Sequence, residues 1–289
     1  MKTAVLGASG YIGSHIWRAY RHAHPDCIGT SHRSQPELHL FDATRPDLTA
    51  LHLRESGHRA AILSIAKPLI GYCETNPAVS RKVNVEATLD IIRQLAKANL
   101  QVIWFSSDYV FDGLSGGYAD DAPTCPQTEY GKQKAEVESL LPGITENHLI
   151  LRLSKTYGTR LGDKTLLDEM AKNLLTGQSV CAAADQYFSP THIDDLVAAV
   201  QGLQSAGARG LFNVSNPEDW SRFQIAKALA QKLGREEQVR KIRLHDLESM
   251  RGRPLNTTLR GHRLQQQFPM PFTPLNISLE RVVQQWRNQ

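Results

Sequence analysis

A glycine-rich loop directly behind the first strand limits the folds open to this chain more than any other feature. Residues 2–6 form a short apolar run, and Gly7, Gly10 and Gly13 follow it at G-x-x-G-x-x-G spacing before an amphipathic stretch. Glycines let the backbone approach a phosphate without a Cβ, and the free N–H groups of the next helix favour an anion. A strand, this loop and a helix in that order predict a nucleotide-binding sheet.

Strand-like and helix-like segments alternate through the first half of the chain. The predicted strands are short, apolar and rich in Ile, Val and Leu, and they are residues 2–6, 27–31, 38–41, 60–65, 101–106 and 149–153. Apolar residues recur at helical spacing between them, over residues 11–21, 47–55, 83–98 and 129–141. This alternation predicts the α/β class, with a Rossmann-type doubly wound parallel sheet and helices on both faces.

The pattern changes past Tyr157, where proline-bearing loops separate the elements. Helical spacing covers residues 166–175, 194–203, 223–233 and 279–286, and a strand is predicted over 211–214. We expect residues 1–157 to form the cofactor-binding domain and residues 190–214 to return to it. Residues 158–189 and 215–289 then form a smaller C-terminal α/β region that binds the substrate.

Composition excludes several classes of protein. Basic residues between positions 235 and 253 are interleaved with acidic ones, and the net charge is only +4, which argues against a nucleic-acid surface. The apolar runs are too short to span a membrane. The four cysteines, at 27, 73, 125 and 181, are scattered, so we expect neither a disulfide framework nor a metal site. Because the first strand starts at Lys2, a signal peptide has no room, and a cytoplasmic protein is expected.

The glycine loop and three strand ends supply the predicted cofactor-binding residues. Where NAD-binding proteins carry a carboxylate after the second strand, this chain has Ser31, His32 and Arg33, which suit the 2′-phosphate of NADPH. The alternative is that His32 and Arg33 are solvated turn residues. Asp42 is expected near the adenine. The rest of the predicted set is Gly7, Ser9, Gly10, Tyr11, Ile12, Gly13, Ala43, Ser64, Ile65 and Ala66.

Tyr130 and Lys134 lie four residues apart, so they share one face of a predicted helix. Reducing a ketone with a hydride leaves an alkoxide, which a phenol can protonate. Work near neutral pH requires the tyrosine pKa of about 10 to fall by about 3 units. A close ammonium, an oxidised nicotinamide and a helix N-terminus can each contribute to that fall. Ser107, at a strand's carboxyl end, can hold the carbonyl oxygen.

Together these residues resemble the extended short-chain dehydrogenases and, within them, the dTDP-4-dehydrorhamnose reductase family. The most specific match is the run Ser106-Ser107-Asp108-Tyr109-Val110-Phe111-Asp112-Gly113. Further matches lie at residues 83–85, 118–134, 152–154, 185–191 and 253–259. The resemblance implies that Ser107, Tyr130 and Lys134 are the catalytic triad, that Tyr130 and Lys134 also contact the cofactor, and that Asp108, Arg253 and Asn256 border the substrate.

Four departures from this family's pattern lie at or near the substrate side. Ser107 stands where a threonine is usual, which keeps the hydroxyl, and Gly71 replaces an aspartate. Residues 64–67 replace an alanine-rich turn. Lys155 stands in place of a tryptophan, and we expect it either to meet an anionic group of the substrate or to turn to solvent.

The sequence therefore predicts NADPH-dependent reduction of a 4-keto group on a nucleotide-activated sugar, with the sugar nucleotide as a small-molecule partner. A homodimer is compatible with this interpretation. Two alternatives stay open: an epimerase or dehydratase that retains NAD, and a non-catalytic NADP-binding regulatory subunit similar to that of methionine adenosyltransferase.

Overall fold

The computed structural model describes residues 1–250 and 252–287, and the chain divides into two compact units. Unit 1 contains residues 1–110, 124–152 and 200–212, and unit 2 contains residues 111–123, 153–199 and 213–289. Residues 251, 288 and 289 of the predicted substrate-binding region lie outside the described part. The predicted boundaries differ from these, because the chain passes between units inside three continuous elements: one strand ending at Leu153, one helix around Ala199 and one strand around Phe212.

Unit 1 is built on a central sheet with the strand order β1-β4-β5-β6-β11. These strands are β1 (Thr3–Leu6), β4 (Ala60–Leu63), β5 (Gln101–Ser107), β6 (His148–Leu153) and β11 (Gly210–Val214). β4 pairs in parallel with both β1 and β5. A parallel bridge from Val5 to Gly29 extends the sheet towards β2 (Thr30–Ser31), which pairs in parallel with β3 (His39–Leu40). The predicted Rossmann-type α/β fold is confirmed.

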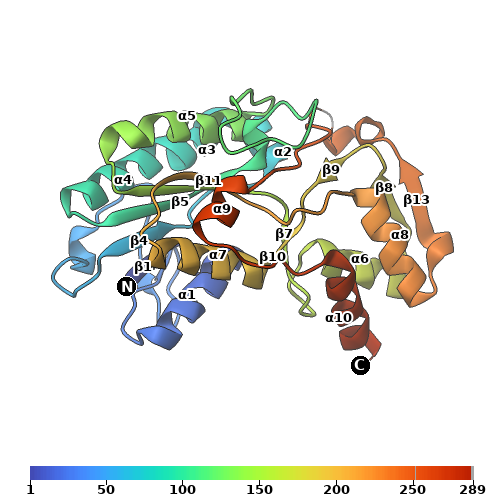
Figure 1. Cartoon of the computed structure of the whole chain (residues 1–289), viewed down its shortest axis with the longest axis horizontal. Coiled ribbons are helices and arrows are strands. Elements are labelled where there is room, and N and C mark those ends of the chain that lie inside the picture. Colours follow the sequence, from blue (N-terminus) through green and yellow to red (C-terminus); the bar gives the residue numbers. More distant parts are fainter. Residues whose placement is uncertain (251, 288–289) are drawn as a thin grey trace. The chain divides into compact units, whose positions relative to one another are not determined.

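Helices cover both faces of this sheet (Figure 1). α4 (Thr88–Lys97) and α5 (Glu129–Ile144) lie on one face, and α1 (Tyr11–Ala23) and α7 (Ile193–Ser205) lie on the other. The predicted helix over 83–98 begins as a π-helix, η2 (Lys82–Ala87), before α4. Two short helices, α2 (Ile70–Thr75) and α3 (Pro77–Arg81), were not predicted. Side chains from the sheet, α4 and α5 contribute to the buried core of unit 1.

The predicted helix over 47–55 is wrong, because only a single 3-10 turn, η1 (Thr49–Leu51), forms there. Gln94 accepts a hydrogen bond from the Leu48 amide at 3.0 Å and donates to the Pro46 carbonyl at 2.8 Å. His52 then adopts a left-handed conformation with φ 44°. The backbone groups of this segment therefore find partners outside a helix, and its leucines still reach the core.

Unit 2 has its own core, formed around a parallel strand pair. β8 (Val180–Ala183) pairs with β13 (Val239–Ile242), and α6 (Leu166–Leu175), α8 (Arg222–Leu233) and α10 (Leu275–Arg287) contribute to the same core. Ser221 begins α8 with a capping box, and Gly234 ends it in a left-handed conformation. The smaller elements are β7 (Thr156–Tyr157), β9 (Tyr187–Phe188), β10 (Thr191–His192), β12 (Trp220–Ser221), η4 (Glu236–Gln238), η5 (Leu244–Asp246), η6 (Glu248–Met250) and α9 (His262–Gln267).

A buried ion pair fastens α5 to β6 in unit 1. The Arg152 guanidinium donates from Nε to Glu138 Oε1 at 3.0 Å and from Nη2 to Oε2 at 2.8 Å, and each side chain is only 5% exposed. Two parallel bonds of this kind fix both side chains in one geometry. Removal of one partner would leave the other charge buried and uncompensated.

We therefore expect Arg152→Met to destabilise the protein by about 3–5 kcal/mol in urea unfolding, because the Glu138 carboxylate stays buried. The double variant Arg152→Met/Glu138→Leu should be clearly more stable than the single one. If the single variant lost less than about 1 kcal/mol, which is typical of an exposed pair, the burial of this ion pair would be contradicted.

Candidate active site

The glycine loop closes tightly between β1 and α1. Gly7 has φ 91°, and a Cβ on it would lie 2.8 Å from the Ser64 carbonyl oxygen. A Cβ on Gly13 would lie 2.2 Å from the Gly7 carbonyl oxygen. Gly10, the N-cap of α1, has no side chain to cap the first turn, and that turn contains no acidic residue. The start of α1 thus has neither a side-chain cap nor a negative charge, which favours an anion there, as a dinucleotide phosphate requires.

The end of β2 presents two side chains at the surface. The Thr30 hydroxyl accepts the Gly7 amide hydrogen bond at 3.0 Å, and the Ser31 hydroxyl accepts that of Arg33 at 3.2 Å. Ser31 is buried, whereas His32 and Arg33 are exposed. Ser31 therefore shapes the turn, and the imidazole and guanidinium are the groups that stand free to meet a phosphate.

The two other predicted strand ends differ in how their side chains are used. Asp42 accepts hydrogen bonds from both the amide and the hydroxyl of Thr44 at 2.8 Å, and these bonds, the hydroxyl's first, lower the Asp42 pKa. Ser64, Ile65 and Ala66 follow β4 and are partly exposed beside the glycine loop. Asp42 thus stabilises its own turn, and the loop after β4 packs on the glycine loop.

The start of α5 brings Tyr130 against the end of β5. Thr128 caps the helix by accepting a hydrogen bond from the Gly131 amide at 3.1 Å. A Cβ on Gly131 would lie 2.1 Å from the carbonyl oxygen of Tyr109, so only glycine allows this close approach. The rings of Tyr109 and Tyr130 then meet edge to face with their centroids 6.4 Å apart.

Ser107 connects this helix to the strand end. Its hydroxyl donates to Asp108 Oδ1 at 3.0 Å and accepts from the Tyr109 amide at 3.2 Å. The Ser107 side chain also acts on the Tyr130 hydroxyl, whose pKa it lowers. Ser107, Asp108 and Tyr130 therefore lie together in unit 1.

Lys134 lies under the same face of α5, 4% exposed. Its Nζ donates to the Phe105 carbonyl oxygen at 2.7 Å and stands 4.6 Å from the centre of the Trp104 ring. Burial lowers the pKa of Lys134 to about 8. The carbonyl and the ring, neither of which sequence reasoning singled out, stabilise the ammonium form against that effect.

The chain's own groups raise the Tyr130 pKa rather than lower it. Burial first and the Asp108 charge second raise that pKa, and the hydrogen bond with Ser107 offsets only part of the rise. The phenol is therefore held in its protonated form. Protonated phenol is the form that gives a proton to an alkoxide, but a raised pKa makes it a weaker donor, so proton transfer near neutral pH needs positive charges that stabilise the phenolate.

Comparison with known proteins assigns the chain to a family. The RmlD substrate binding domain model matches residues 1–288. The chain belongs to this family. A probable low-salt glycan biosynthesis reductase, Agl14 of Haloferax volcanii, is 31% identical over 225 residues, covering 75% of each chain. The dTDP-4-dehydrorhamnose reductase of Sinorhizobium fredii is 26% identical over 302 residues, covering 98% of this chain and 97% of that one.

Two further similarities bear on the alternatives. The methionine adenosyltransferase 2 subunit beta of Xenopus laevis is 24% identical over 246 residues, covering 79% of this chain and 71% of that one. The crystal structure of the Bacillus anthracis dTDP-4-dehydrorhamnose reductase in complex with NADP has a TM-score of 0.87 at 21% identity, covering 98% and 99% of the two chains. The latter likeness confirms the fold of the RmlD family.

The remaining substrate candidates of this RmlD-family chain lie in unit 2. Lys155 is exposed, and its carbonyl accepts a hydrogen bond from the Thr191 amide at 3.0 Å. Arg253 is partly exposed, and its amide donates to the Met250 carbonyl at 3.2 Å. Both side chains can reach solvent, where a ligand could meet them. Their contact with a substrate stays a prediction.

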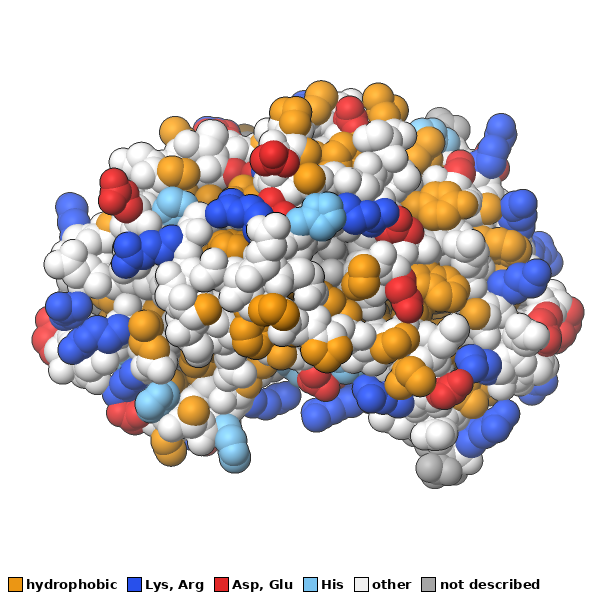
Figure 2. All heavy atoms as spheres, viewed as in Figure 1, with side chains coloured by type: hydrophobic (Ala, Val, Ile, Leu, Met, Phe, Trp, Pro, Cys, Tyr) orange, Lys and Arg blue, Asp and Glu red, His pale blue; other side chains and the backbone are white. Residues whose placement is uncertain are grey.

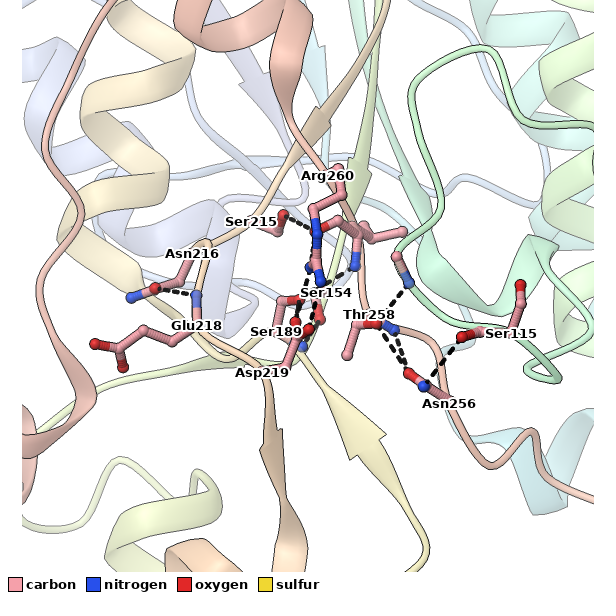
Figure 3. Close-up of polar contacts among 12 residues, drawn as sticks. Ser115, Ser154, Ser189, Ser215, Asn216, Glu218, Asp219, Asn256, Thr258 and Arg260 are labelled. Atoms are coloured by element: carbon pink, nitrogen blue, oxygen red, sulfur yellow. Dashed lines mark hydrogen bonds and ion pairs between the residues drawn. The ribbon is translucent and has the colours of Figure 1, made fainter.

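Asn256, the third candidate in unit 2, has a visible structural role (Figure 3). Its Oδ1 accepts from the Thr258 hydroxyl at 2.9 Å, and its Nδ2 donates to the Ser115 carbonyl at 3.4 Å. A Cβ on Gly116 would lie 2.2 Å from the Asn256 amide, so this loop packs directly on it. Asn256 thus fixes residues 113–117, the loop at the end of the family-specific run over residues 106–113.

Neighbouring bonds anchor the same segment of unit 2. The Ser189 hydroxyl accepts from the Leu259 amide at 3.1 Å and donates to Asp219 Oδ1 at 3.1 Å, and Arg260 Nη1 donates to the same Asp219 oxygen at 2.8 Å. Figure 3 shows these side chains converging on one point of the segment. These hydrogen bonds hold the family-matched segment over residues 253–259 in position, and the sequence motif gave no indication of them.

Charges and metal-ligand residues are dispersed. Figure 2 shows lysine and arginine side chains scattered among acidic ones on the visible face. Residues 1–250 and 252–287 contain no group of three or more His, Cys, Asp or Glu that could hold a metal ion. In the same ranges, no helix is long and apolar enough to cross a membrane.

The buried lysine gives the RmlD-family chain a testable pH dependence. The Lys134 pKa is about 8 when folded, against the ordinary 10.5, so the unfolded chain binds more protons between these values and stability must rise with pH there. Relative to Lys134→Met, the wild type should gain up to about 3 kcal/mol in urea unfolding across this window. Lys132→Met, which alters an exposed lysine of the same helix, should follow the wild-type curve. If the difference in the free energy of unfolding between the wild type and Lys134→Met did not change with pH, the effect of burial on the Lys134 pKa would be contradicted.

Proposed function

We propose that this protein is an NADPH-dependent reductase that acts on a 4-keto group of a nucleotide-activated sugar. The observation that carries the proposal is the arrangement within unit 1, where Lys134 Nζ lies 5.7 Å from the centre of the Tyr130 ring and donates a hydrogen bond to the Phe105 carbonyl near the end of β5. The same unit contains the glycine loop at the start of α1. A proton donor and a dinucleotide site in one unit are what ketone reduction needs.

In this mechanism the chain's own residues handle the oxygen. When bound, the reduced nicotinamide supplies the hydride. Ser107 donates a hydrogen bond to the ketone oxygen and holds it near Tyr130. The Tyr130 phenol, kept protonated by its surroundings, gives its proton to the oxygen as negative charge develops there. The Lys134 ammonium then stabilises the phenolate that remains.

The glycine loop, the start of α1, the strand-end residues 31–33 and 42–43, and the loop over 64–66 would hold the dinucleotide. Tyr130 and Lys134 would contact its nicotinamide half, and Asp108, Lys155, Arg253 and Asn256 would bind the sugar nucleotide. The names of the Haloferax and Sinorhizobium relatives, both reductases, support this class of reaction. The departures at Gly71 and Lys155 favour a sugar other than the plain deoxysugar.

The proposal is tested with a panel of TDP-, GDP-, UDP- and CDP-linked 4-keto sugars, following NADPH absorbance. We expect turnover with at least one member. Tyr130→Phe should lower kcat by about 100-fold or more, because it removes the proton donor, and should leave NADPH affinity nearly unchanged. No turnover across the panel, or a Tyr130→Phe variant as active as the wild type, would overturn the assignment.

A separate titration tests the cofactor. Since His32 and Arg33 are exposed at the end of β2 with no carboxylate among residues 31–34, NADPH should bind more tightly than NADH in calorimetry. Arg33→Ala should weaken NADPH binding by about 10- to 100-fold, the effect of losing a charge-assisted hydrogen bond, and should hardly change NADH binding. Arg93→Ala, at an exposed arginine of α4, is the control. Equal affinity for both cofactors would remove the 2′-phosphate assignment.

A second function is favoured by one observation, the similarity to a methionine adenosyltransferase regulatory subunit. Such a protein would bind NADP and a synthetase without turning over a sugar. The two functions separate in one experiment: size-exclusion chromatography with a methionine adenosyltransferase catalytic subunit, beside the sugar-nucleotide panel. A stable complex without turnover supports the regulatory function, and turnover without a complex supports the reductase.

A further inference from the structure

A buried series of side-chain amides connects the catalytic helix to the loop that follows β4. Gln133, between Tyr130 and Lys134 on α5, is 3% exposed. Its Nε2 donates to the Ser80 hydroxyl at 2.9 Å, and its Oε1 accepts from Asn84 Nδ2 at 2.7 Å. Both ends of this amide are therefore bonded inside unit 1, and its orientation is fixed.

Asn84 in turn holds the peptide of Lys67. Its Oδ1 accepts from the Lys67 amide at 2.7 Å, and its Nδ2 donates to the Lys67 carbonyl at 3.1 Å. The Cys73 thiol donates to that carbonyl as well, at 3.2 Å. One side chain thus satisfies both backbone groups of Lys67, as a neighbouring strand would. Asn84 lies in the π-helix η2, and π-turns are frequent at functional sites.

The loop held in this way is the one packed on the phosphate loop. A Cβ on Gly7 would lie 2.8 Å from the Ser64 carbonyl and 3.0 Å from the Ile65 side chain. Lys67 therefore directly follows residues 64–66, which are predicted to contact the cofactor. The side-chain amides of Gln133 and Asn84 connect this loop to the helix that carries Tyr130 and Lys134. Among the backbone hydrogen bonds of the described residues, none joins that helix to Lys67.

We propose that Gln133 is a positioning residue, which through Asn84 fixes the loop over 64–67 relative to the catalytic helix. Its role in the reaction rests on the proposed reductase function. Gln133 bonds to Ser80, Pro77 and Asn84 rather than to the catalytic side chains. It acts on geometry, and a misplacement of about 1 Å between reacting groups can cost about 100-fold in rate.

The first test measures amide hydrogen exchange by NMR, which needs no substrate. Gln133→Met keeps the length of the side chain but removes its acceptor and donors, so Asn84 loses one partner. The Lys67 amide should then exchange about tenfold faster or more, while the amides of Ile62 and Leu63 in β4 keep their wild-type protection. Lys132→Met, the exposed neighbour, should leave all three unchanged.

Gln133→Glu provides the rescue, because a carboxyl group has nearly the same shape and its oxygens can still accept from Asn84. It should keep the protection factor of Lys67 closer to the wild-type value than Gln133→Met does at the same pH. Unchanged exchange at Lys67 in Gln133→Met, or an equal rise at Ile62 and Leu63, would overturn the proposal. If Gln133→Met does not fold, Asn84→Asp, which loses both donated bonds, takes its place under the same criteria.

The second test separates this inference from the proposed function. With a sugar nucleotide that the wild type reduces, Gln133→Met should lower kcat by about 10- to 100-fold with a smaller change in KM, and Gln133→Glu should recover part of it. If Gln133→Met speeds exchange of the Lys67 amide but leaves kcat unchanged, the positioning role is overturned. If the wild type reduces none of the panel, the reductase proposal fails, and the exchange result still decides whether Gln133 holds the loop.

Discussion

The buried ammonium of Lys134 is the constraint on which the rest of unit 1 depends. A lysine that is 4% exposed must have strong partners, and it finds the Phe105 carbonyl at 2.7 Å and the face of Trp104. Both partners lie on β5, so α5 must lie against the end of that strand. Gly131 allows this approach, and the Arg152–Glu138 pair holds the middle of the helix against β6.

The same arrangement explains why the phenol is protonated. Burial and the Asp108 charge oppose the phenolate, while the Ser107 bond favours it less strongly. An acid that stays neutral until charge develops on a nearby oxygen is suited to finishing a reduction. The chain's own groups therefore keep Tyr130 protonated, and the positive charges that would stabilise its phenolate during turnover come from Lys134 and the bound cofactor.

Sequence patterns located most of unit 1, because the glycine loop, the apolar strands and the Tyr-x-x-x-Lys spacing are local signals. The error over 47–55 arose because Gln94, forty-six positions from Leu48, binds the backbone at the start of the segment, and local turn bonds form after it instead of a helix. The roles of Gln133 and Asn84 were likewise out of reach, since they come from contacts between segments distant in the chain. For Asn256, a motif match indicated a substrate contact, and the structure adds a bracing role within unit 2.

The central claim, that a hydride passes from this protein's cofactor to a sugar ketone, is tested most directly by isotope transfer. The protein is mixed with NADPH carrying deuterium at the reactive carbon of the nicotinamide and with a 4-keto sugar nucleotide, and the product is analysed by mass spectrometry and NMR. The account predicts one deuterium per product sugar, bound to the carbon that carried the ketone, with released NADP. Deuterium that stays on a protein-bound cofactor while the sugar is converted, or never leaves NADPH, would contradict it.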